Sequence, residues 1–227
     1  MRIDNIAWDI EPDIVKRFLP PRSLPPDHPQ PIHICIDRHD GRTKDYMYIE
    51  VASQAAAKRI LQTRQNVPMP GGKATGGRTR VVTISQVTHR ELLCELRPGS
   101  KAELIWLLEL CEAALSTDPA PSPATPVLGR LRHQAAVSAG KRVHYIKYRQ
   151  SPFHALMSIM SKLRGPESPA YWDVFYVASG AIALLATSLK SGGPDRSTDD
   201  QLLQHMSSLF DTCFGRRIAP VPHDQSP

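Results

Sequence analysis

The sequence predicts an α+β protein: a four-stranded antiparallel sheet with two helices on one face, followed by a mainly helical extension. Residues 1–86 alternate in the order strand, helix, strand, strand, helix, strand. From about residue 88 onward the apolar residues recur at helical spacing only. The chain has 227 residues, of which 41% are hydrophobic and 22% charged, so it is long enough to bury a core.

The first strands are predicted by alternation of apolar and polar residues. Residues 1–6 form a short strand pattern, residues 32–37 place three isoleucines on one face, and residues 46–51 are rich in aromatic and β-branched residues. The last two segments flank a glycine-containing turn, so they are expected to pair as an antiparallel hairpin. A short amphipathic helix is expected after Pro12, because Pro is favoured in a first helical turn.

The second half of this unit is predicted in the same way. Ser53 caps a helix over residues 54–65, and the glycine-rich residues 68–77 are expected to form a loop. Residues 78–85 are expected to form the last strand, with either Val82 and Ile84 or Val81 and Thr83 facing inward. Residues 19–31 hold six prolines and are expected to form a stiff surface connection.

The extension is divided by a proline-rich segment. Helices are expected at about residues 88–97, 100–116, 153–164, 171–190 and 198–214. Residues 118–126 hold four prolines and are predicted to be a linker, and residues 216–227 are predicted to be a disordered tail. The expected units are therefore a first domain over residues 1–86 and a helical extension over residues 87–215.

The chain start and the cysteines point to an intracellular protein. Acidic residues fall within the first 19 residues, where a secretory signal needs an apolar core. The uncharged residues 174–189 are fewer than the ~20 that a membrane span needs, so a buried helix is expected and no membrane partner. The widely spaced cysteines form no C-x-x-C pair and are expected to be reduced thiols; they are Cys35, Cys94, Cys111 and Cys213.

Two short segments carry a resemblance to a known family. Residues 44–51 place Lys44, Tyr46, Tyr48 and Ile49 where the RNA-recognition-motif octapeptide K/R-G-F/Y-G/A-F-V-x-F/Y has its basic, aromatic and aliphatic residues. Residues 1–6, with Asn5, are similar to the hexapeptide of the family's first strand, and Trp8 also fits its pattern. Residues 1–86 therefore resemble the RNA-recognition-motif family. The resemblance implies a ferredoxin-like βαββαβ sandwich that binds single-stranded RNA without catalysis.

Alternation along the third strand separates two sets of side chains. Met47, Ile49 and Val51 are expected to cover the helices, which leaves Tyr46 and Tyr48 on the open face of the sheet, where their rings could stack on unpaired bases. Lys44 and Arg2 are expected to contact phosphates, and Lys73 and Arg80 to add positive charge. The predicted RNA-binding residues are Arg2, Asn5, Lys44, Tyr46, Tyr48, Lys73 and Arg80.

Three residues depart from the family pattern. Asp45 replaces a glycine, Met47 replaces a small residue and Arg2 replaces an aromatic residue, so only modest affinity is expected through the sheet. The alternative to RNA binding is a protein-interaction module whose sheet is covered by its own helical extension or by a partner. The extension itself is also a candidate surface for protein partners.

Charge is distributed unevenly along the chain, whose formal net charge is +6. Residues 51–90 contain seven Lys or Arg and no acid, which suits either a polyanion-binding surface or a solvated positive face. The basic and aromatic residues 141–149 could extend a nucleic-acid track or form an amphipathic surface segment.

No sequence pattern supports catalysis. Residues 71–75 lack the P-loop spacing, and the nine histidines show no metal-ligand spacing. No nucleophile and base can be paired from the sequence, so we expect a non-enzymatic protein with no cofactor and no metal.

Overall fold

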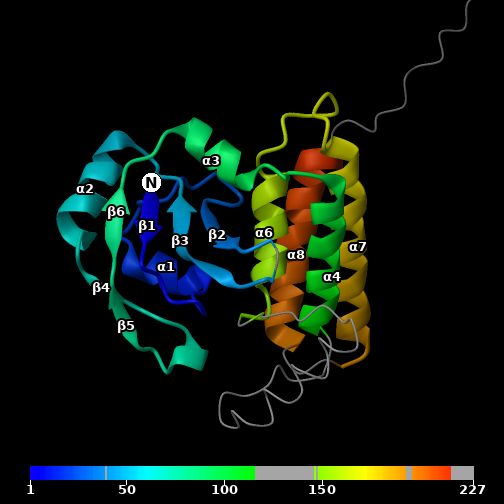
Figure 1. Ribbon diagram of the computed structural model, residues 1–227, viewed down its shortest axis with the longest axis horizontal. Coiled ribbons are helices and arrows are strands. Elements are labelled where there is room, and N and C mark those ends of the chain that lie inside the picture. Colours follow the sequence, from blue (N-terminus) through cyan, green and yellow to red (C-terminus); the bar gives the residue numbers. More distant parts are fainter. Residues whose placement is uncertain (39, 116–145, 147, 193–195, 216–227) are drawn as a thin grey trace, which may run out of the picture.

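The computed structural model describes residues 1–38, 40–115, 146, 148–192 and 196–215. A sheet-bearing N-terminal part lies beside a bundle of helices (Figure 1). The described elements are β1 (Arg2–Asp4), α1 (Pro12–Phe18), β2 (Ile32–Ile36), β3 (Thr43–Ile49), α2 (Gln54–Arg64), β4 (Pro68–Pro70), the 3₁₀ helix η1 (Lys73–Thr75), β5 (Thr79–Val81), β6 (Thr83–Ser85), α3 (His89–Leu96), α4 (Lys101–Leu115), α6 (Ser151–Met160), α7 (Tyr171–Lys190) and α8 (Arg196–Phe214).

The main sheet has four antiparallel strands in the order β2-β3-β1-β6. Ile3 lies opposite Met47 on β3 and opposite Ile84 on β6, so these three side chains share one face. They pack with residues of α1 and α2 in one buried cluster, which also contains Val15 and Ile60. The predicted α+β class and the placement of both helices on one face are therefore confirmed.

The expected single strand over residues 78–85 is wrong, because two sheets divide this segment. β5 pairs with β4 in a separate two-stranded sheet, whereas β6 pairs with β1 in the main sheet. Val82 lies between them and is fully buried together with Ile84, while Val81 is 51% exposed. This settles which residues face inward. Because the β4–β5 hairpin intervenes, the elements do not follow the clean six-element order that the sequence predicted.

The helices α4, α6, α7 and α8 form the bundle, and each begins and ends close to a helix expected from the sequence. Their apolar sides meet in a second large core that includes Phe153, Leu185 and Phe214. α4 and α7 run in the same direction, since Lys101 pairs with Asp173 near their starts and Leu108 packs on Gly180 further along. By length and composition α7 is long and apolar enough to cross a membrane, and one of its faces is buried in this core.

The bundle is joined to the sheet along its edge strand β2, against which α6 packs (Figure 1). Glu50, which follows β3, bonds His33 on β2 and Lys162 after α6. Burial acts against ionisation of Glu50, but hydrogen bonds from His33 and Lys162 outweigh it and lower the pKa of Glu50 to about 2. The expected linker over residues 118–126, the expected tail and most of residues 141–149 lie outside the described residues.

Candidate nucleic-acid interface

The two tyrosines of β3 lie on the expected face of the sheet, but that face is not open. Met47 and Ile49 are buried on the helix side, as alternation predicted. Helix α3 lies across the opposite side, where Leu92 and Leu96 pack with Tyr48 and Cys35. Tyr48 is only 5% exposed, so its ring has no free face for a base. The expectation of an uncovered tyrosine platform is wrong, because the chain continues past β6 directly onto it.

Tyr46 is half-buried, and its hydroxyl takes part in a polar cluster with α3. The Lys44 ammonium donates to Glu95 Oε1 at 2.8 Å and to the Tyr46 hydroxyl at 3.0 Å, while the Tyr46 hydroxyl donates to Glu95 at 3.1 Å. Burial alone would lower the pKa of Lys44, but the bonds to Glu95 and Tyr46 raise it above its ordinary value. Lys44 and Tyr46 therefore hold α3 on the sheet.

The two predicted RNA-binding residues of the first strand also have internal partners. The Arg2 guanidinium lies 4.1 Å from the centre of the Tyr46 ring and pairs with Asp4 at 2.7 Å. Asn5 adopts a left-handed backbone conformation with a φ of 62°, and its Nδ2 donates to the carbonyl of Val81 at 2.8 Å. Arg2 thus covers one side of the Tyr46 ring, and Asn5 connects the end of β1 to the hairpin.

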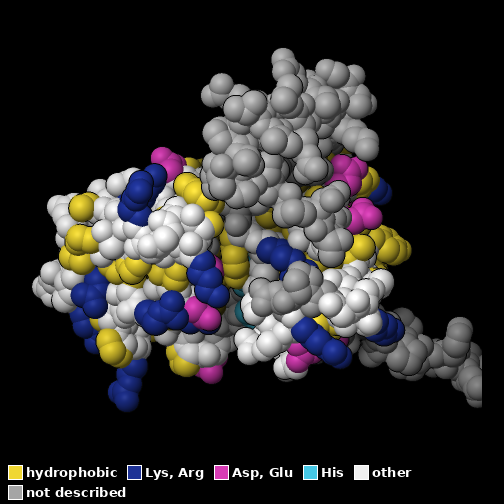
Figure 2. All heavy atoms as spheres, turned by 90° about the horizontal axis from the view of Figure 1, so that it is seen from below, with side chains coloured by type: hydrophobic (Ala, Val, Ile, Leu, Met, Phe, Trp, Pro, Cys, Tyr) yellow, Lys and Arg dark blue, Asp and Glu magenta, His cyan; other side chains and the backbone are white. Residues whose placement is uncertain are grey.

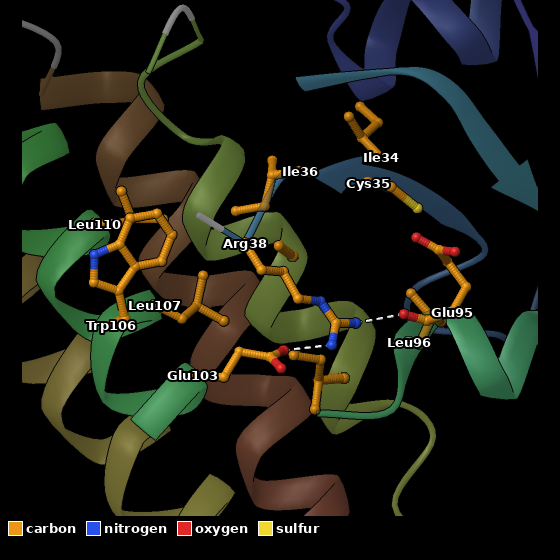
Figure 3. A pocket seen from close by; sticks show the side chains of 12 residues that line it. Ile34, Cys35, Ile36, Arg38, Glu95, Leu96, Glu103, Trp106, Leu107 and Leu110 are labelled. Atoms are coloured by element: carbon orange, nitrogen blue, oxygen red, sulfur yellow. Dashed lines mark hydrogen bonds and ion pairs between the residues drawn. The ribbon is translucent and has the colours of Figure 1, made fainter. Parts of the chain in front are cut away.

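Helix α3 is fixed at both ends. Thr88 and Glu91 form a capping box at its start, in which each side chain bonds the other's backbone. At its other end, Arg38 donates to the carbonyls of Glu95 and Arg97. Arg38 also pairs with Glu103 of α4, so that it lies between Glu95 and Glu103 (Figure 3). The cavity beside Arg38 has a volume of about 30 Å³, which is room for about two or three water molecules and not for a nucleobase.

The remaining predicted residues, Lys73 and Arg80, lie on the β4–β5 hairpin and are not part of the cluster that the tyrosines form with α3. Both are exposed, and Arg80 donates to the carbonyl of Ile6 at 3.3 Å. Together with cations of α2 they form what we call the cationic surface. Its members are Lys58, Arg59, Arg64, Lys73, Arg78 and Arg80.

The cationic surface lies at the end of the molecule farthest from the bundle, where α2, β4 and β5 form the outer edge (Figure 1). All of its members except Arg64 are exposed, and within the described residues none of them forms an ion pair. Figure 2 shows Lys and Arg side chains spread over this sheet-bearing half. The sequence indicated this surface through its run without acids, but could not show which helix and strands carry it.

Two other reactive groups of the described residues, His154 and Cys35, are buried. No group of three or more His, Cys, Asp or Glu within them could hold a metal ion. Burial lowers the pKa of His154 to about 3 and raises that of Cys35 to about 12, so a neutral imidazole and an inert thiol are expected at these positions. The four cysteines form no disulfide, as predicted.

Comparison with known proteins gives one match. Residues 1–107 match the model of a family described as a domain of unknown function, DUF8400. No curated protein and no solved structure matches the chain. The matched residues extend from β1 into α4, so α3 belongs to the matched region together with the sheet that it covers.

Proposed function

We propose that this protein binds single-stranded RNA without catalysis, and that the RNA contacts the cationic surface and not the covered tyrosines. The proposal rests on one observation: exposed Lys and Arg side chains gather on α2 and the β4–β5 hairpin, and within the described residues no acid neutralises them. The resemblance of residues 1–86 to the RNA-recognition motif supports RNA as the polyanion.

The physical basis is the release of counterions from the strand. Each phosphate that a cation neutralises frees bound counterions, and for single strands the slope of log K against log salt is about −0.7 per phosphate. Four to six phosphates on the cationic surface correspond to a slope of about −3 to −4. Binding should then weaken about a hundredfold between 50 and 200 mM salt.

Fluorescence anisotropy of a labelled mixed-sequence RNA tests the proposal. The double variant Lys58→Glu/Arg78→Glu should bind about tenfold more weakly or worse, and its salt slope should be smaller by about 1.4. Lys190→Glu, an exposed charge reversal on the bundle, serves as the matched control and should leave affinity within about twofold. Binding that lacks salt dependence, or that the double variant leaves intact, would overturn the proposal.

A protein-binding role is the second candidate, and the bundle favours it. Three large apolar side chains are about half exposed or more on the neighbouring helices α4 and α7: Ile105 at 47%, Trp172 at 54% and Tyr176 at 67%. Exposed aromatic residues are enriched at protein interfaces. If the chain shows no salt-dependent binding of RNA, protein binding is favoured over RNA binding as its function.

A further inference from the structure

A hollow of about 680 Å³ opens beside the cationic surface, between α1, the end of α2 and the loop that follows β4. Its volume lies within the range of about 300–1,000 Å³ that is typical of small-ligand sites, so it can admit a group the size of one nucleotide. The hollow is lined by charged and glycine residues among others, including Arg17, Arg64, Lys73, Gly72, Gly76 and Gly77.

The charges around the hollow favour an anion. Three of its lining residues are cationic and only Glu11 is acidic. Of the other acids on α1 and just before it, Asp13 pairs with Lys16 at 3.0 Å on the exposed side of the helix. Asp9 is buried at 3% exposure and faces the loop. Arg17, Arg64 and Lys73 outnumber the two nearby acids, Glu11 and Asp9, and within the described residues none of the three cations forms an ion pair.

The loop after β4, which forms one wall of the hollow, is fixed by hydrogen bonds to the buried carboxylate of Asp9. The Asp9 carboxylate accepts from the backbone N–H of Gly72 at 3.0 Å, and from the N–H and hydroxyl of Thr75 at 2.7 and 3.0 Å. A Cβ on Gly72 would lie 2.2 Å from the Asp9 carbonyl oxygen, so only glycine fits there. Because Lys73 lies between Gly72 and Thr75, these hydrogen bonds also fix the backbone from which its side chain extends.

At the rim of the hollow, two glycines leave the backbone accessible to a ligand. Gly76 and Gly77 have φ values of +65° and +70°, and an added Cβ at either would meet nothing within 4 Å. Glycine adopts this conformation without strain and lets a ligand approach the backbone closely.

On the opposite wall the Arg64 side chain is positioned by α1. Its Nε donates to the carbonyl of Phe18, and its guanidinium carbon lies 5.5 Å from the centre of the Phe18 ring. The guanidinium is thus held against the end of α1, where Arg17 projects from the last turn.

From this geometry we infer that the hollow binds a phosphodiester group of the RNA strand, held by Arg17, Arg64 and Lys73. The inference rests on the proposed function and assigns it a definite anchoring site. Contacts of cations and backbone with phosphate carry no base information, so binding at this site is independent of sequence. The strand would run from here over the rest of the cationic surface.

NMR titration of the full chain with a uridine hexanucleotide tests the inference. We expect saturable shifts of the Gly76 and Gly77 amide signals, and loss of these shifts with a hexanucleotide whose linkages are uncharged methylphosphonates. In Arg17→Glu/Lys73→Glu the shifts should disappear and affinity should fall about tenfold or more. Both side chains are exposed, so the variant should fold, which the unchanged signals of the bundle would verify.

The outcomes separate the two proposals. If the hexanucleotide binds with salt dependence but leaves both glycine signals in place, the hollow is not the anchor and the proposed function survives. If the methylphosphonate strand shifts the glycines equally, phosphate recognition is refuted. If no RNA binds at all, the proposed function fails and the inference fails with it.

Discussion

Replacing Tyr48 by alanine should destabilise the protein, because the ring belongs to the core between the sheet and α3. Tyr48 is 5% exposed and packs with Leu92 and Leu96. It also makes an edge contact with the Tyr46 ring at 5.9 Å, an arrangement worth about 0.5–1.5 kcal/mol. Truncating a buried aromatic side chain typically costs about 3–5 kcal/mol, so we expect a loss of about 3–4 kcal/mol in the free energy of unfolding.

Urea unfolding followed by far-UV circular dichroism measures this loss. A decrease of that size should move the midpoint down by about 1–2 M urea. Tyr176→Ala, at a 67% exposed position on α7, is the matched control and should change stability by less than about 0.5 kcal/mol. If Tyr48→Ala unfolds at the wild-type urea concentration, α3 does not cover the sheet and the tyrosines are available to bases after all.

Two further perturbations test the contact between the sheet and the bundle at Glu50 and the contact between Gly72 and Asp9. The folded-state pKa of Glu50, about 2, lies below its ordinary value of 4.5, so Glu50 contributes stability that is present above pH 4.5 and lost as the pH falls toward 2. A shift of this size corresponds to about 3 kcal/mol, so Glu50→Gln should flatten acid unfolding between these pH values. An unchanged acid profile would contradict this. Gly72→Ala should lower the melting temperature, because its Cβ would collide with the Asp9 backbone, whereas Gly215→Ala meets only an ordinary contact and should melt as the wild type does.

The covered tyrosines show where prediction from the sequence stops. A helix over residues 88–97 was predicted, and its Leu92 and Leu96 lie one helical turn apart on one side. The periodicity gives the apolar side of a helix but not the surface that this side will cover. The sheet face bearing Tyr48 was one of several surfaces available to it. The prediction that this face binds RNA therefore followed from the motif. The motif did not show that α3 would cover the same face.

The cationic surface was predicted more directly. A run that contains Lys and Arg but no acids has a positive net charge wherever it lies in the fold. Residues 51–90 therefore indicated a positive surface before any fold was known. The hollow was not predictable, because Arg17 and Lys73 are far apart in sequence and their approach depends on Asp9 ordering the loop.

The sequence by itself determined much of the local structure of this protein: its α-helices, the strands β1 to β3, the two faces of β3 and the sign of charge along α2 and the hairpin. These follow from side-chain periodicity and charge, which act over a few residues. Only the tertiary structure decided that α3 covers Tyr48, that residues 78–85 divide between two sheets, and that Arg17, Arg64 and Lys73 surround one hollow. Each of these depends on contacts between distant segments, which are selected by the packing of the whole chain.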